Sequence, residues 1–262
     1  MKQSKLSDAN HEAWETMAYE AWVKEWGSPT EAAAQLVDDP DHKVRRFLPH
    51  LPDIKGKRIA NPLGSNGRLA IAFALLGADV TVFDISTSNR RFALEVAHHA
   101  GVKINFVVGD FLAISLNDYR NTFDITVLEL GILHYFSDLT SLLGVLHSIL
   151  KQNGFLVINE FHPLLKKAIA VEDGEARLTG NYFATSPENA DVAYQSILND
   201  DSLPKCLVRR WTLGEIVTAF AKSRFQIELL EELPDWNCDR LPGMFTLVLR
   251  KSNAQQTDAP DA

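Results

Sequence analysis

The sequence predicts an α/β fold built on a doubly wound, mostly parallel sheet. Short β-branched segments alternate with helical apolar patterns along the chain, as successive βαβ units require. A glycine turn follows the first of these strands, and an acidic residue, Asp84, ends the second. With 262 residues, the chain is long enough for one such domain with a sizeable core and some extra elements.

The first βαβ unit runs from Lys57 to Asp84. Gly64 and Gly67 permit a tight turn and a close approach of the backbone to a ligand. The helix that follows directs its first N–H groups at whatever lies over the turn. Asp84 stands about 20 residues further on, where a carboxylate accepts hydrogen bonds from ribose hydroxyls. The alternative is that the glycines only form a loop and that Asp84 caps the helix starting near Thr87.

The glycine turn is not a dinucleotide-binding turn, because it lacks the pattern G-x-G-x-x-G. It resembles motif I of the class I S-adenosylmethionine (SAM) dependent methyltransferases, commonly D-x-G-x-G-x-G. In a gapless alignment Asn61 stands at the acidic position, Leu63 and Ser65 at the first two glycines, and Gly67 at the third. The resemblance implies SAM as cofactor and a seven-stranded sheet of order 3-2-1-4-5-7-6.

The later strands and helices recur in the order that this family has. Strands are expected at residues 59–61, 80–83, 104–108, 123–128, 154–159, 225–231 and 244–250, the last two antiparallel. Helices are expected at residues 69–76, 89–100, from Ser137 or Asp138 through Leu150, and from Thr212, whose capping box with Glu215 starts a helix through Ala221. The resemblance covers Lys57 to Lys251.

The resemblance also implies a cofactor site at the carboxyl ends of the strands. Asp110 would accept a hydrogen bond from the adenine amino group, and Glu129 is a candidate either to hold the ammonium group of SAM or to bind a cationic substrate. For Asp110 the alternative is that it caps a short helix at 111–115. The implied cofactor-binding residues are Asn61, Gly64, Ser65, Asn66, Gly67, Asp84, Ile85, Gly109, Asp110, Phe111, Glu129, Leu130 and Gly131.

Candidate catalytic residues follow the fourth and fifth strands. His134 and His162 have the residue type suited to taking a proton from the methyl acceptor at neutral pH. Tyr135 is a candidate to orient or bound the acceptor, and Arg209 and Arg210 are candidates to clamp a carboxylate. The alternatives are that each histidine only shapes the wall of the site and that the two arginines form a solvated face.

The chain divides into three segments in this interpretation. Residues 1–56 form an N-terminal helical extension, with one helix at 10–25 and a second that Ser28 caps. This extension either packs on the helical layer of the sheet or folds over the site as a lid. Residues 57–251 form the SAM-binding domain, with a hairpin-like insertion at about 164–210, and residues 252–262 form a disordered tail.

Composition limits the function classes. The net charge of −8 and the pI of about 5.5 argue against a nucleic-acid binder, so a small-molecule acceptor is expected. Two cysteines, no signal peptide and no apolar run of membrane length indicate a cytoplasmic protein, monomer or homodimer, outside the membrane. No metal site is expected, because His98 and His99 are adjacent on a helix and cannot share one face.

Two other functions stay open at this point. An NAD-dependent oxidoreductase would need a dinucleotide loop and a Tyr/Lys or Cys/His catalytic pair, and neither is evident. The second open function is a methyltransferase-like binding protein without turnover. It stays open because motif I departs from the family pattern at three positions.

Overall fold

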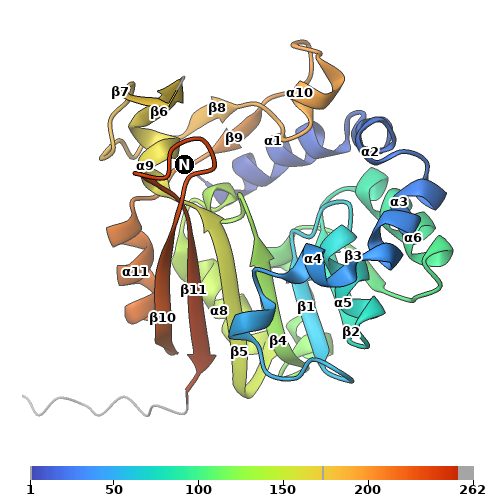
Figure 1. The fold of residues 1–262 in the computed structure, drawn as a ribbon. Helices are drawn as coiled ribbons and strands as arrows, with labels where there is room; N and C mark the ends of the chain where they lie inside the picture. The colour runs from blue at the N-terminus through green and yellow to red at the C-terminus, as the bar shows by residue number, and fades with distance from the viewer. Residues whose placement is uncertain (1, 173, 253–262) are drawn as a thin grey trace, which may run out of the picture.

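The computed structural model describes residues 2–172 and 174–252, and its centre is a seven-stranded sheet (Figure 1). The strand order is β3-β2-β1-β4-β5-β11-β10, which in chain order of the sheet strands is the expected 3-2-1-4-5-7-6. Only β11 runs antiparallel to its neighbours β5 and β10. The strands are β1 (Arg58–Pro62), β2 (Asp79–Asp84), β3 (Asn105–Val108), β4 (Phe123–Glu129), β5 (Leu150–Phe161), β10 (Phe225–Pro234) and β11 (Pro242–Lys251). The predicted fold class is therefore confirmed.

Helices cover both faces of this sheet. The α-helices of the sheet domain are α5 (Arg68–Leu75), α6 (Thr87–His99), α7 (Leu116–Tyr119), α8 (Leu139–Ile149) and α11 (Leu213–Ala221); the 3-10 helices are η2 (Phe111–Ala113) and η3 (Leu133–Tyr135). Alternate residues of a strand pack into two separate hydrophobic cores. Ile59 packs with α5 and α6, whereas Ala60 packs with α8 and α11. This period of two follows from the pleat of the strands.

The N-terminal segment forms α1 (Gln3–Glu15), α2 (Ala18–Trp26), α3 (Pro29–Asp38), α4 (Pro40–Val44) and the 3-10 helix η1 (Leu48–His50). Figure 1 shows α1 passing across the top of the sheet, above the carboxyl ends of the parallel strands, and α2 and α3 beside α6. The capping box of Ser28 and Glu31 at the start of α3 is present as predicted.

The single helix expected at 10–25 is wrong, because the chain turns at Thr16 and Met17. Met17 has a left-handed φ of 61°. The hydroxyl of Tyr194 lies within hydrogen-bond distance of the carbonyl oxygens of Ala13 and Thr16, so a residue from the distant insertion takes up the last carbonyls of α1. The break lets α1 and α2 take different directions.

The segment between β5 and α11 contains two short hairpin-like ladders. It comprises α9 (Pro163–Lys167), β6 (Ile169–Glu172), β7 (Glu175–Leu178), β8 (Glu188–Ala190), α10 (Gln195–Leu198) and β9 (Cys206–Val208). The side chain of Asn10 in α1 exchanges two hydrogen bonds with the backbone of Leu207 in β9, which attaches this segment to the N-terminal helices. Of the expected tail at 252–262, residues 253–262 lie outside the described residues.

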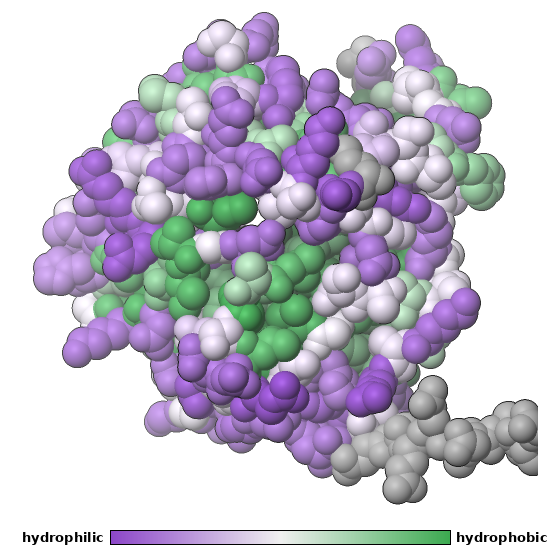
Figure 2. Space-filling model, turned by 180° about the vertical axis from the view of Figure 1, so that it is seen from behind, coloured by the Kyte–Doolittle hydropathy of each residue, from purple (hydrophilic) through white to green (hydrophobic). Residues whose placement is uncertain are grey.

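The face turned away in Figure 1 shows hydrophobic residues gathered near its centre, with hydrophilic residues over most of the remainder (Figure 2). Within residues 2–172 and 174–252, no helix is long and apolar enough to cross a membrane.

Candidate functional site

A cavity of about 950 Å³ lies at the carboxyl ends of β1, β2 and β4. Residues from α1 to α4 and from the segment between β5 and α11 complete its wall. The volume is at the upper end of the usual range for ligand pockets, about 300–1,000 Å³, so it has room for a nucleoside and a second small molecule. The sequence-predicted residues that line it are Asn61, Gly64, Ser65, Asn66, Asp84, Ile85, Gly109, Asp110, Phe111, Glu129, Leu130, Gly131, His134 and Tyr135.

The turn after β1 keeps a glycine-like backbone although it holds few glycines. Leu63, Ser65 and Gly67 have φ values of 50°, 48° and 71°, all in the left-handed region. Such a conformation costs a side-chain-bearing residue about 1–2 kcal/mol. At Gly67 a Cβ atom would lie 2.6 Å from the Cβ of Ala93, so glycine is needed there for the close packing of α6.

Asp84 joins the end of β2 to this turn. Its Oδ2 accepts a hydrogen bond from the backbone N–H of Ser65 at 2.9 Å, and its Oδ1 accepts from Ser86 N and Asn89 Nδ2 at 3.0 Å each. Burial raises the pKa of the Asp84 carboxyl, and the three donors oppose that effect. The cap of α6 is the Ser86 hydroxyl, so the alternative role of Asp84 as that cap does not hold.

Asp110 caps the short helix η2, which is the alternative considered for it. One oxygen accepts from Leu112 N at 2.8 Å and caps η2, and the other accepts from the Ser7 hydroxyl of α1 at 2.6 Å. The side chain also borders the cavity. The neighbouring Phe111 is buried, with its ring centroid 5.5 Å from that of Phe83.

The loop after β4 is organised by Glu160, to which the sequence reasoning gave no role. Its carboxylate accepts hydrogen bonds from the backbone N–H groups of Phe161 and of three loop residues, Gly131, Ile132 and Leu133. Burial raises the pKa of Glu160, against the effect of these donors. The only sequence signal was an acid near the end of the apolar strand β5.

Glu129, at the end of β4, borders the cavity and is paired with Lys43 of α4 at 2.8 Å. Sequence reasoning missed this lysine and a second cation, Arg68, which is buried and stacks 4.0 Å above the ring of Trp26. Burial lowers the pKa of Arg68 to about 10. Lys43, the partner of Glu129, and Trp26, the partner of Arg68, both lie in the N-terminal helices. Sequence patterns around the strands therefore held no signal of these contacts.

The two candidate histidines lie in different surroundings. His134 lines the cavity, and burial together with the positive charges of Arg210 and Lys166 lowers the pKa of its imidazole to about 3. His162 is absent from the described cavity lining. It is buried, its Nδ1 accepts from Leu164 N at 3.2 Å to cap α9, and its Nε2 lies 2.8 Å from Glu232 of β10.

Tyr135 faces the cavity beside α1. Its hydroxyl accepts a hydrogen bond from Trp14 Nε1 at 3.0 Å, and burial raises its pKa. The side chain of Gln3 bonds the carbonyl of Tyr135 at 3.0 Å and the N–H of Ser137 at 2.8 Å. The start of α1 is therefore held against the loop after β4.

A methyltransferase family model matches the part of the chain that holds β2 to β4 and one edge of the cavity. The family model described as "Methyltransferase domain" matches residues 63–158, which include the cavity residues from the turn after β1 to the loop after β4. This match to a methyltransferase domain spans a little more than a third of the chain, and it supports the resemblance to the class I SAM-dependent methyltransferases. The comparison with curated proteins gives no match.

Solved structures of SAM-dependent methyltransferases share the fold of this chain. A putative SAM-dependent methyltransferase from Listeria monocytogenes is 17% identical, with a TM-score of 0.64 over 80% of this chain and 98% of its own. A SAM-dependent methyltransferase from Mesorhizobium loti is 21% identical, with a TM-score of 0.63 over 82% and 99%. The magnesium protoporphyrin IX methyltransferase from Synechocystis, solved with bound S-adenosylhomocysteine (SAH), is 13% identical, with a TM-score of 0.59 over 94% and 100%.

SAM is the cofactor of this family, and the donor and acceptor groups of the cavity fit it. SAM presents ribose hydroxyls and an adenine amino group, which are hydrogen-bond donors, and Asp84 and Asp110 offer carboxylate oxygens at the ends of adjacent strands. Glu129 offers carboxylate oxygens for an ammonium group, which would share them with Lys43. Among the described residues no cluster of side chains suited to a metal ion is found.

Proposed function

We propose that this protein transfers the methyl group of SAM to a small molecule held in the same cavity. One observation carries the proposal: the residues implied for the cofactor, except Gly67, and the candidate catalytic residues His134 and Tyr135 line one cavity roofed by the N-terminal helices. Hydrogen bonds from Gln3 and Ser7 and the ion pair of Lys43 hold that roof in place. A roofed cavity suits a small acceptor, because a polymer would have to displace these helices.

Three carboxylates would hold three different parts of SAM. Asp84 would hold the ribose, Asp110 the adenine amino group, and Glu129 the ammonium group. When bound, SAM supplies an electrophilic methyl group on a sulfonium. The roof excludes water from that group, as transfer to an acceptor other than water requires.

His134 is the candidate to face the acceptor. An imidazole whose pKa is about 3 is neutral, so it can accept a hydrogen bond from an O–H or N–H group of the molecule to be methylated. The same low pKa means that it holds a transferred proton poorly. We therefore assign it an orienting role, with Tyr135 as part of the wall. His162 is left out of this proposal because its two ring nitrogens face Leu164 and Glu232.

Calorimetric titration of the purified protein with SAM, SAH and NADH tests the cofactor. We expect SAM and SAH to bind and NADH not to bind. Incubation with methyl-labelled SAM and a panel of small acceptors, followed by mass spectrometry, then tests transfer. Absence of binding by both adenosyl compounds would overturn the proposal, and binding without transfer to any acceptor would favour a binding protein without turnover.

A further inference from the structure

We propose that the methyl acceptor carries a carboxylate, which Lys166 and Arg210 bind at one end of the cavity. The inference rests on the proposed function, since it concerns the acceptor side of the same cavity. Lys166 belongs to α9, directly after β5, and Arg210 follows β9. Both side chains line the cavity, together with His134 and Phe161.

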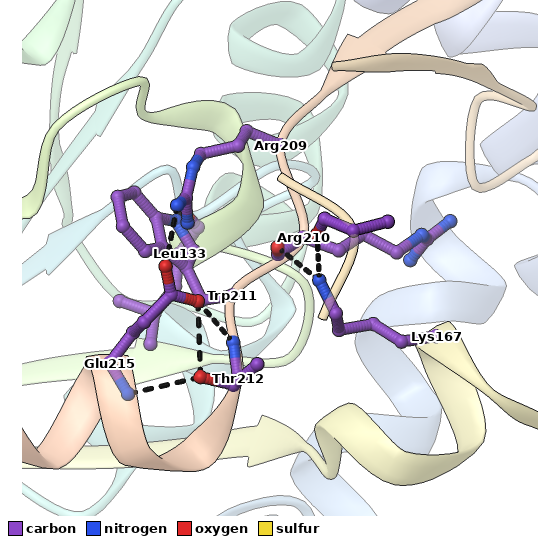
Figure 3. Close-up of polar contacts among 8 residues, drawn as sticks. Leu133, Lys167, Arg209, Arg210, Trp211, Thr212 and Glu215 are labelled. Carbon is purple, nitrogen blue, oxygen red and sulfur yellow. Dashed lines mark hydrogen bonds and ion pairs between the residues drawn. The ribbon is translucent and has the colours of Figure 1, made fainter. Parts of the chain in front are cut away.

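Hydrogen bonds to backbone carbonyls hold α9 and the segment around Arg210 together. The Nζ of Lys167 donates to the carbonyl oxygen of Arg210 at 2.7 Å and to that of Ala184 at 2.6 Å. Figure 3 shows Lys167 reaching the carbonyl of Arg210. The indole N–H of Trp211 donates to the carbonyl of Leu133 at 3.0 Å, which fixes the same segment to the loop after β4. Arg210 is thereby placed by its neighbours on both sides.

Arg209 and Arg210 point in different directions, so they do not clamp a ligand together. In Figure 3 the side chain of Arg209 turns toward Glu215 and Trp211, whereas that of Arg210 extends to the opposite side of the segment. Arg209 Nη2 lies 2.6 Å from Glu215, and its guanidinium lies 3.3 Å from the Trp211 ring centroid. Lys166, which the sequence reasoning did not consider, takes the place expected for Arg209.

The two cavity cations have hydrogen-bond donors that no described residue satisfies. The ammonium of Lys166 lies 4.1 Å above the Phe161 ring and has neither a hydrogen bond nor an ion pair within residues 2–172 and 174–252. Arg210 uses its Nε for Glu188, and its two terminal nitrogens have no partner in the same part of the chain. The other described cations of the lining are engaged: Lys43 with Glu129, Arg45 with the carbonyl of His42, and Arg68 with the carbonyl of Ala32 and the side chain of Gln35.

Lys166 is exposed, so water reaches its ammonium group and its donors are available to a ligand that accepts hydrogen bonds. Partial desolvation, then the charge of Arg210, lower the pKa of Lys166. Glu160 and Asp235 act on Lys166 from beyond ion-pair distance, and the Glu160 charge is already held by backbone N–H groups.

The local charge favours a singly charged group. Glu188 balances Arg210, so one positive charge, that of Lys166, is left for a ligand. A carboxylate matches that single charge, whereas a phosphate dianion would leave one negative charge unbalanced. A carboxylate bound there directs the remainder of the acceptor along His134.

The test uses matched pairs of small ligands and protein already saturated with SAH. Calorimetry measures the affinity for a panel of aryl and alkyl carboxylates, their primary amides and the corresponding phosphates. The amides keep the shape of the carboxylate without its charge, and the phosphates carry more charge. We expect the best carboxylate to bind at least tenfold more tightly than its amide and its phosphate analogue. Lys166→Met should abolish that preference, Lys166→Arg should keep it, and Lys222→Met, an exposed lysine of α11's end, should leave it unchanged.

The outcomes separate this inference from the proposed function. If SAH binds and no carboxylate is preferred over its amide, or if none of the panel binds, the carboxylate site is overturned while the cofactor assignment stands. Preference for the phosphates also overturns it. If SAH itself does not bind, the proposed function fails first. Equal melting temperatures for Lys166→Met and the wild type ensure that a lost preference reflects the lost charge.

Discussion

Lys43 and Glu129 form an ion pair between the N-terminal helices and the sheet. The Nζ of Lys43 lies 2.8 and 2.9 Å from the two carboxylate oxygens of Glu129, and both side chains are partly exposed, at 29% and 25%. Because Glu129 borders the cavity, α4 is attached directly to a residue implied for cofactor binding. The roof and the floor of the cavity therefore meet at this pair.

Lys43→Met should loosen the roof while changing the free energy of unfolding little. A partly exposed ion pair contributes about 0–1 kcal/mol, so we expect SAH to dissociate up to about fivefold faster. Stopped-flow tryptophan fluorescence measures the release, and urea unfolding measures the stability. Lys5→Met removes an exposed lysine of α1 and serves as the control. Unchanged release would show that α4 does not limit exit.

Asp84→Asn should weaken SAH binding by about 10- to 100-fold, since a hydrogen bond to a charged group contributes about 1.5–3 kcal/mol. The amide keeps the size of the side chain but places an NH₂ group against one of three N–H donors, so a small loss of stability accompanies it. Calorimetry gives the affinity. Asp79→Asn, at the exposed start of the same strand, is the matched control. Wild-type affinity in Asp84→Asn would move the ribose site elsewhere.

Ser65→Gly should raise the free energy of unfolding by about 1 kcal/mol. Ser65 has a φ of 48°, and its buried hydroxyl has no hydrogen-bond partner among the described residues. Glycine removes both costs at the expense of backbone entropy. Urea unfolding measures the change, and Asn199→Gly, an exposed residue with a φ of 56°, controls for the backbone alone. A loss of stability, or a loss of SAH affinity, would show that the hydroxyl has a partner.

His147→Gln should flatten the dependence of stability on pH between about pH 6.5 and 4. Burial, then the charges of Lys251 and Arg224, lower the pKa of His147 to about 4, whereas an unfolded histidine titrates near 6.5. The unfolded state therefore binds the proton more readily in this window. The stability that depends on a neutral His147 is present above pH 6.5 and is lost as the pH falls to about 4.

The expected loss for the wild type is about 1–2 kcal/mol after allowance for screening by water. Urea unfolding at pH 7 and pH 4.5 measures it for the wild type, His147→Gln and His98→Gln, the last an exposed histidine of α6. Equal slopes for the wild type and His147→Gln would contradict the burial argument.

The sequence by itself determined the sheet and the edge where the cavity lies. The alternation in β1, β2 and β4, the turn at Gly64 and the acids at strand ends are local signals, because each depends on residues near in the chain. Helix starts were equally local: Ser28 with Glu31 and Thr212 with Glu215 form the predicted capping boxes.

Only the tertiary structure decided which of the polar residues face the cavity. His134 and His162 look equivalent in sequence, but β10 brings Glu232 to His162, whereas Lys166 and Arg210 come to lie near His134. Tyr194 likewise ends α1 from more than a hundred residues away. Such partners meet through packing of distant segments, and no local periodicity encodes them, so these assignments depended on the folded chain.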